Sequence, residues 1–134
     1  MVPIVLCIDD QPELLELRKA TLESNGFRVE TATSGYAAIK ILEAGPCDAV
    51  LLEYKQQGID AEAVAYQLHL RFPNLPIILL SAYFEMPERI LWLVDAHVMK
   101  SELPEGLVRV IEEVTLRSDA AREHWTPPKR KPAA

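Results

Sequence analysis

The sequence predicts a doubly wound α/β domain built on a five-stranded parallel sheet. Short apolar segments rich in β-branched residues alternate with longer amphipathic segments, and this alternation recurs five times along the chain. Most of the short segments are apolar at nearly every position, which is typical of strands covered by helices on both faces. The chain of 134 residues has the length of one ordinary domain.

The first two strand–helix repeats are marked by turn and capping signals. The first strand is predicted over Val2–Ile8, an apolar run, and the helix after it over Pro12–Asn25. Asp10 is a candidate N-cap for that helix, and the Asn-Gly pair at its end is typical of a helix stop. The second strand is predicted over Phe27–Ala32, where apolar residues alternate, and the second helix over Ser34–Glu43.

The remaining three repeats follow the same pattern. Prolines mark several boundaries, because proline cannot continue a helix: Pro73 follows the third helix and Pro76 precedes the fourth strand. The predicted strands are Ala49–Glu53, Ile77–Leu80 and Ala96–Met99. The predicted helices are Ala61–Phe72, Pro87–Val94 and Pro104–Leu116.

The order of these elements also predicts the topology. Five strand–helix units joined by right-handed crossovers fit a flavodoxin-like (βα)5 arrangement with strand order 2-1-3-4-5. In such a sheet the ligand crevice lies at the carboxyl ends of the first and third strands. The domain is expected to span residues 1–117. Residues 118–134 contain a Pro-Pro-Lys-Arg-Lys-Pro run and are predicted to form a flexible basic tail.

Composition narrows the class of function. The net charge of −6 argues against general nucleic-acid binding, which needs a basic surface to displace counterions from the backbone. The two cysteines form neither a disulfide framework nor a metal motif. The N-terminus lacks the pattern of a signal peptide, and the apolar runs are far shorter than the roughly 18 residues of a membrane span. We therefore expect a cytoplasmic protein that does not associate with membranes.

Polar side chains stand where four of the five predicted strands end. Asp9 and Asp10 follow the first strand, Glu53 ends the third, Ser81 follows the fourth and Lys100 follows the fifth. The carboxyl ends of parallel strands share one edge of the sheet, so these groups are expected to converge. Adjacent carboxylates repel each other and favour a cation, and hard oxygen ligands suit Mg²⁺.

This pattern resembles the receiver domains of response regulators in two-component and phosphorelay signal transduction, over about residues 2–116. The resemblance implies that the acidic pair binds Mg²⁺, that the acid of the third strand receives a phosphoryl group, and that a hydroxyl and a lysine contact it. An aromatic side chain near the fifth strand then changes rotamer. The positions that carry the resemblance are Asp9, Asp10, Glu53, Ser81, Ala82 and Lys100, and His97 stands at the position of the aromatic side chain.

Several positions depart from the family pattern. Glu53 replaces the phosphoacceptor aspartate, and its extra methylene displaces the carboxylate toward Lys100, with which we expect an ion pair. His97 replaces the switch aromatic, and Ser101 replaces the proline that follows the lysine in the family. Lys55 stands where a backbone carbonyl completes the metal site, and its ammonium group is expected to leave only weak Mg²⁺ binding at Asp9, Asp10 and Lys55.

Three functions are compatible with this pattern. The first is a non-enzymatic, phosphorylation-independent interaction module, in which the permanent charge of Glu53 imitates a phosphoryl group. The alternative is a conventional phosphoacceptor that takes phosphate from a histidine kinase and catalyses its own phosphotransfer. The third, a flavin carrier, is disfavoured because the first loop, Asp9-Asp10-Gln11-Pro12, would repel a phosphate.

The predicted surface of the fourth helix, fifth strand and fifth helix is unusually apolar. A helix on a sheet buries one stripe, so the run of five apolar residues at 90–94 is expected to turn some apolar area outward. We expect no DNA-binding or catalytic domain to follow the predicted domain. We therefore expect this surface to bind a protein partner or a second copy of the chain. The candidate interface residues are Ile90, Trp92, Leu93, Val108 and Ile111.

Overall fold

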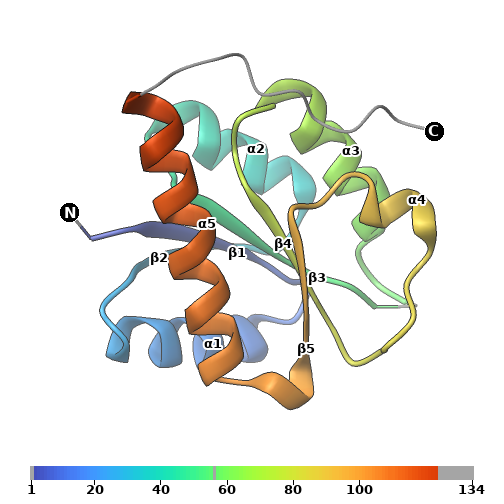
Figure 1. Cartoon of the computed structure of the whole chain (residues 1–134). Helices are drawn as coiled ribbons and strands as arrows, with labels where there is room; N and C mark the ends of the chain where they lie inside the picture. The colour runs from blue at the N-terminus through green and yellow to red at the C-terminus, as the bar shows by residue number, and fades with distance from the viewer. Residues whose placement is uncertain (1, 56, 124–134) are drawn as a thin grey trace.

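The computed structural model describes residues 2–55 and 57–123, and it confirms the predicted fold. Five parallel strands pair in the order β2-β1-β3-β4-β5 (Figure 1). The strands are β1 (Ile4–Ile8), β2 (Arg28–Ala32), β3 (Ala49–Glu53), β4 (Ile77–Ser81) and β5 (Ala96–Met99). The helices are α1 (Pro12–Ser24), α2 (Gly35–Ala44), α3 (Ala61–Arg71), α4 (Glu88–Leu91), the 3₁₀ turn η1 (Lys100–Glu102) and α5 (Glu105–Glu123).

The helices cover both faces of the sheet. α1 and α5 lie on one face, and α2, α3 and α4 lie on the other (Figure 1). Successive strand residues point to opposite faces, so Leu51 of β3 packs with α1 and α5, whereas Leu52 packs with the other three helices. Glu53 continues the alternation on the side of Leu51, which directs its side chain toward α1 and α5.

The first helix begins differently from the prediction. Its N-cap is Gln11, and no side chain caps the helix, so the prediction that Asp10 is the N-cap is wrong. The Asp9 carboxylate instead accepts a hydrogen bond from the backbone amide of Gln11 at 3.0 Å. Asp10 contacts Lys55. Asp10 therefore pairs with the charged side chain of Lys55 and does not cap the helix.

The last helix is longer than predicted. α5 continues to Glu123, so residues 118–123 are helical and do not belong to a flexible tail. This stretch contains neither glycine nor proline, and a helix that is already nucleated extends at little cost through such residues. The predicted tail also includes residues 124–134, which lie outside the described residues.

Within the described residues, no helix combines the length and apolar character needed to cross a membrane.

The predicted interface is wrong for three of its five residues. Ile90, Leu93 and Ile111 are buried in the core of the domain, at 0%, 6% and 0% exposure. Ile90 and Leu93 are three residues apart, so they share the side of the chain that faces the core, whereas Leu91 between them is 39% exposed. Trp92 and Val108 remain half-buried and accessible.

Candidate functional site

The predicted site residues do meet at the carboxyl edge of the sheet. Asp9 follows β1, Glu53 ends β3, Ser81 ends β4 and Lys100 follows β5. The parallel register brings these four strand ends to one edge. Asp9, Glu53 and Ser81 are buried. Burial is unusual for carboxylates, so the charges of Asp9 and Glu53 require partners. Ala82 follows Ser81 and is exposed.

Glu53 is held by two cations. Its Oε1 atom forms an ion pair with the Lys100 ammonium group, as the sequence predicted. Its Oε2 atom lies 3.6 Å from the guanidinium of Arg18, a contact that the sequence analysis missed. The Glu53 side chain is 4% exposed and that of Arg18 is 11% exposed, so this contact is largely shielded from solvent. Each oxygen of this buried carboxylate therefore faces a cation.

The position of Arg18 follows from the helical period. Leu15, Arg18 and Leu22 are spaced by three and four residues and share one face of α1. The two leucines are buried in the core against the sheet, so this face also carries Arg18 inward. An arginine in a leucine stripe, on the helix that follows the first acidic pair, is the sequence signal that could have identified this partner.

The acidic pair after β1 is also neutralised within the chain. The Lys55 ammonium group lies 2.5 Å from Asp9 Oδ1 and 3.1 Å from Asp10 Oδ1. The hydrogen bond from Lys55 is the main cause of the lowered pKa of the Asp10 carboxyl. Burial by itself would lower the pKa of Lys55, but the hydrogen bonds to Asp9 and Asp10 outweigh it and the pKa is raised. Both pKa shifts favour the charged forms of Asp10 and Lys55.

Ser81 is engaged away from Glu53. Its hydroxyl donates to the carbonyl of Tyr83 at 2.8 Å and lies 2.7 Å from His97 Nε2. Because the carbonyl can only accept, the hydroxyl proton points to Tyr83 and the imidazole donates from Nε2. Burial lowers the pKa of His97, with an opposing effect from Glu102. His97, at the position of the switch aromatic, is thus tied to Ser81.

Taken together, three acids face three cations at this edge. Lys55 forms ion pairs with both Asp9 and Asp10. Glu53 forms ion pairs with Arg18 and Lys100. In the described ranges, 2–55 and 57–123, no group of three or more His, Cys, Asp or Glu side chains is arranged to hold a metal ion. Lys55 contacts one oxygen of Asp9 and one of Asp10, so a divalent ion would have to displace a like charge, and the arrangement does not fit Mg²⁺ as it stands.

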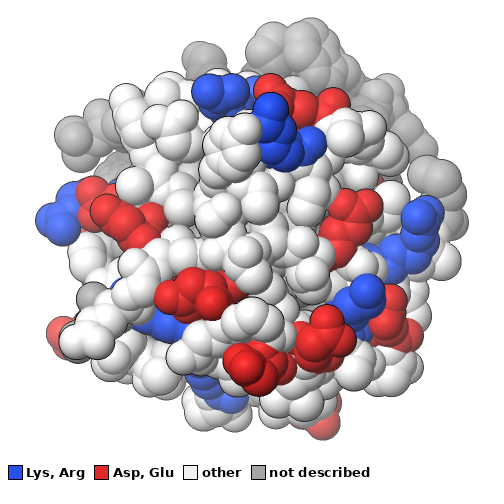
Figure 2. Space-filling model, turned by 180° about the vertical axis from the view of Figure 1, so that it is seen from behind, with Lys and Arg blue, Asp and Glu red and all other residues white. Residues whose placement is uncertain are grey.

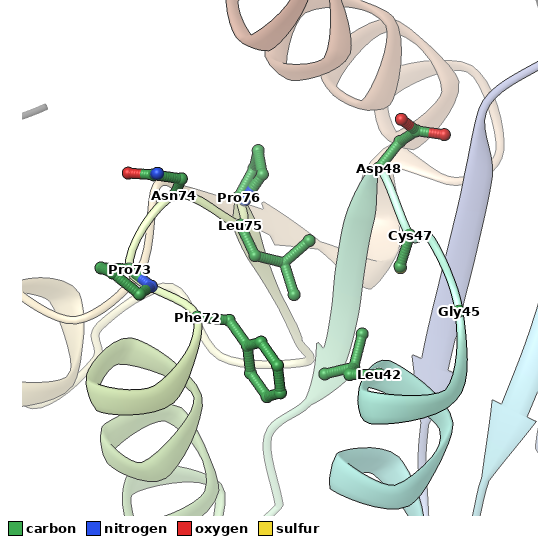
Figure 3. Close-up of a pocket in the computed structure, with 9 residues that line it drawn as sticks. All are labelled: Leu42, Gly45, Cys47, Asp48, Phe72, Pro73, Asn74, Leu75 and Pro76. Atoms are coloured by element: carbon green, nitrogen blue, oxygen red, sulfur yellow. The ribbon is translucent and has the colours of Figure 1, made fainter. Parts of the chain in front are cut away.

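A separate pocket lies at the opposite edge of the sheet. It has a volume of about 290 Å³ and is bordered by Asp48 and Pro76, which precede β3 and β4 (Figure 3). The side chains of Leu42, Phe72 and Leu75 converge on it in Figure 3. Cys47 also borders it, but burial raises the pKa of this thiol to about 11, so the sulfur is protonated at neutral pH and a poor nucleophile.

The surface charge is mixed on the face seen in Figure 2. Acidic and basic side chains there are interspersed with uncharged areas, and they form no continuous basic patch on this face. This distribution agrees with the net charge of −6. It does not provide the basic stripe that phosphate backbones require.

Comparison with known proteins identifies the family of this fold and site. The sequence pattern of the response regulator receiver domain matches residues 5–111. The chain is 35% identical over 129 residues to the sensor protein GacS of Pseudomonas syringae, covering 92% of this chain and 13% of GacS. It is 31% identical over 123 residues to the response regulator MprA of Mycolicibacterium vanbaalenii, covering 92% of this chain and 52% of MprA.

The curated relatives are mostly longer than this chain, which spans 19% of the transcriptional regulatory protein GlrR of Escherichia coli. Among solved structures, the response regulator TrrA of Thermotoga maritima, in complex with Mg²⁺ and BeF, superimposes with a TM-score of 0.76 and 30% identity. The match covers 84% of this chain and 99% of TrrA. The fold, the ordered strand-end residues and these matches show that the chain belongs to the response regulator receiver domain family.

Proposed function

We propose that this receiver domain signals by protein contact without being phosphorylated, with Glu53 in the position of the phosphoacceptor. The observation that supports this proposal is the double ion pair of Glu53 with Lys100 and Arg18. In the family, the lysine after the fifth strand contacts the phosphoryl group. In this chain the corresponding lysine, Lys100, is already ion-paired with the carboxylate of Glu53.

The chemistry of Glu53 also disfavours phosphotransfer. A nucleophilic carboxylate needs a free oxygen with access to the phosphodonor, but both Glu53 oxygens face cations and the side chain is only 4% exposed. Lys55 contacts one oxygen of Asp9 and one of Asp10, where a metal that aligns the donor would bind. We therefore expect Mg²⁺ to bind weakly and to be unnecessary for the folded arrangement of the site.

A second candidate function is that of a conventional phosphoacceptor. TrrA, at 30% identity, was solved in complex with the histidine kinase ThkA, and GacS is itself a sensor histidine kinase in Pseudomonas protegens. These relatives favour a histidine kinase as an upstream partner. In that function Glu53 would leave Arg18 and Lys100 and form an acyl phosphate.

Incubation with acetyl phosphate and Mg²⁺, followed by intact mass spectrometry, separates the two functions. We expect wild type to keep its mass, because Glu53 is ion-paired and displaced by one methylene. Glu53→Asp withdraws the carboxylate from Lys100, and it is expected to gain one phosphoryl group if Mg²⁺ displaces Lys55 from the acidic pair. Stable phosphate on Glu53 of wild type would establish the second function, and failure of Glu53→Asp would show that loss of the aspartate alone does not explain the inactivity.

We further propose that the contact surface lies on α4, β5 and α5 around Trp92 and Val108. Both residues are accessible, and buried aromatic side chains contribute strongly to binding once a partner covers them. Analytical ultracentrifugation tests the homodimer form of this proposal. Trp92→Glu is expected to weaken self-association, whereas Leu17→Glu on exposed α1 surface is a control that should not. A monomer in all three proteins would exclude the homodimer.

A further inference from the structure

The Lys55 ammonium group occupies a specific position between two chain segments. It comes from the loop after β3 and contacts one oxygen of Asp9 and one of Asp10, in the loop after β1. The Lys55 side chain is 20% exposed and Asp9 is 4% exposed, so the shorter of the two contacts is largely shielded from solvent. The ammonium group therefore joins two loops through the carboxylates that a divalent ion would need.

The same loop also approaches the other oxygen of the Asp10 carboxylate, through Gly58. Gly58 has φ +99°, and a Cβ atom at this position would lie 2.1 Å from Asp10 Oδ2. The backbone of the loop therefore lies directly against the second oxygen of Asp10. With Lys55 at Oδ1 and Gly58 at Oδ2, the Asp10 carboxylate is covered by the same loop on both of its oxygens.

The electrostatic balance explains why such a cation is needed here. Asp9 and Asp10 are adjacent, and Asp9 is buried, so their two negative charges would destabilise the folded edge without a nearby cation. A lysine ammonium group is a compact point charge with three donors, and it can contact several carboxylate oxygens at once. A divalent ion arriving at the same oxygens would be repelled by this charge and would have to displace it.

We propose that the Lys55 ammonium group is the resident cation of the acidic site, in the place that a divalent metal would take between Asp9 and Asp10. The chain thereby links its β1 and β3 loops without a metal. This inference deepens the proposed function, which already invokes Lys55 at the acidic pair, but its test does not depend on whether Glu53 accepts phosphate.

Removal of the ammonium group should create a metal site. We expect Lys55→Ala to bind Mn²⁺ about tenfold more tightly than wild type or better, because a like charge a few ångströms from the ion is lost. Binding is followed by the paramagnetic broadening of the backbone amides of residues 9–11 at increasing Mn²⁺. Lys40→Ala is the matched control, since it removes the same charge from an exposed position on α2.

Thermal unfolding gives a second readout. Mg²⁺ should raise the midpoint of Lys55→Ala, because a ligand that binds only the folded state stabilises it, and should leave wild type and Lys40→Ala nearly unchanged. Lys55→Met serves if Lys55→Ala does not fold. The proposal is overturned if wild type binds Mn²⁺ at micromolar concentration, or if the folded Lys55 variant binds it no more tightly than Lys40→Ala. The acetyl phosphate experiment on Glu53 can fail without changing either outcome.

Discussion

Glu53→Gln is expected to lower the free energy of unfolding by about 2–4 kcal/mol, because it leaves two cations beside a buried neutral group. The amide keeps the size of the side chain, so the change removes charge and creates no cavity. Lys100 is one-third exposed and can turn toward water, whereas the Arg18 side chain is only 11% exposed and cannot easily do so. The loss should therefore come mainly from Arg18. Urea denaturation of both proteins at pH 7 measures it.

The matched control for this prediction is Glu62→Gln. Glu62 also pairs with an arginine, Arg89, but both side chains are exposed, at 38% and 74%. An exposed pair of this kind contributes about 0–1 kcal/mol. Equal losses in Glu53→Gln and Glu62→Gln would show that the Glu53 ion pairs are no stronger than those of the surface.

Arg18→Met is expected to lower the free energy of unfolding by about 1–3 kcal/mol, because the buried carboxylate of Glu53 then keeps only Lys100 as a cationic partner. Methionine fills much of the volume beside Leu15 and Leu22, so the packing of α1 is retained. Urea denaturation measures this loss as well.

Arg71→Met provides the comparison for Arg18→Met. Arg71 lies 3.9 Å from Glu43, and both side chains are about half exposed, so the change should cost less than about 1 kcal/mol. If Arg18→Met is as stable as Arg71→Met, the guanidinium contributes nothing to holding Glu53.

The sequence predicts the sheet well because its three central strands, β1, β3 and β4, are buried at nearly every position and therefore read as continuous apolar runs. β3 and β5 begin and end at the predicted residues, and the strand order is as expected. The ends of helices are less predictable. α5 extends past residue 117 because residues 118–123 contain neither glycine nor proline. α4 ends at Leu91, before the end of its apolar run, of which only Ile90 and Leu93 are buried.

The site was predictable to the extent that strand ends determine it. The convergence of Glu53 and Lys100 follows from strand order alone. The contact of Arg18 with Glu53 depends on the phase of α1 and on the alternation along β3, which must be combined before the pair is evident. The hydrogen bond between Ser81 and His97 could not be predicted, because it depends on the side-chain rotamers of two residues in neighbouring strands, one at the end of β4 and one near the start of β5.

The coupling free energy between Arg18 and Glu53 tests most directly whether the chain's own cations hold the acid at the phosphoacceptor position. It is obtained from the stabilities of wild type, Arg18→Met, Glu53→Gln and the double variant. We expect a coupling of about 1–3 kcal/mol, so that the double variant loses less than the sum of the single losses. A coupling below about 0.3 kcal/mol, no larger than that of the exposed Glu62–Arg89 pair, would contradict this account.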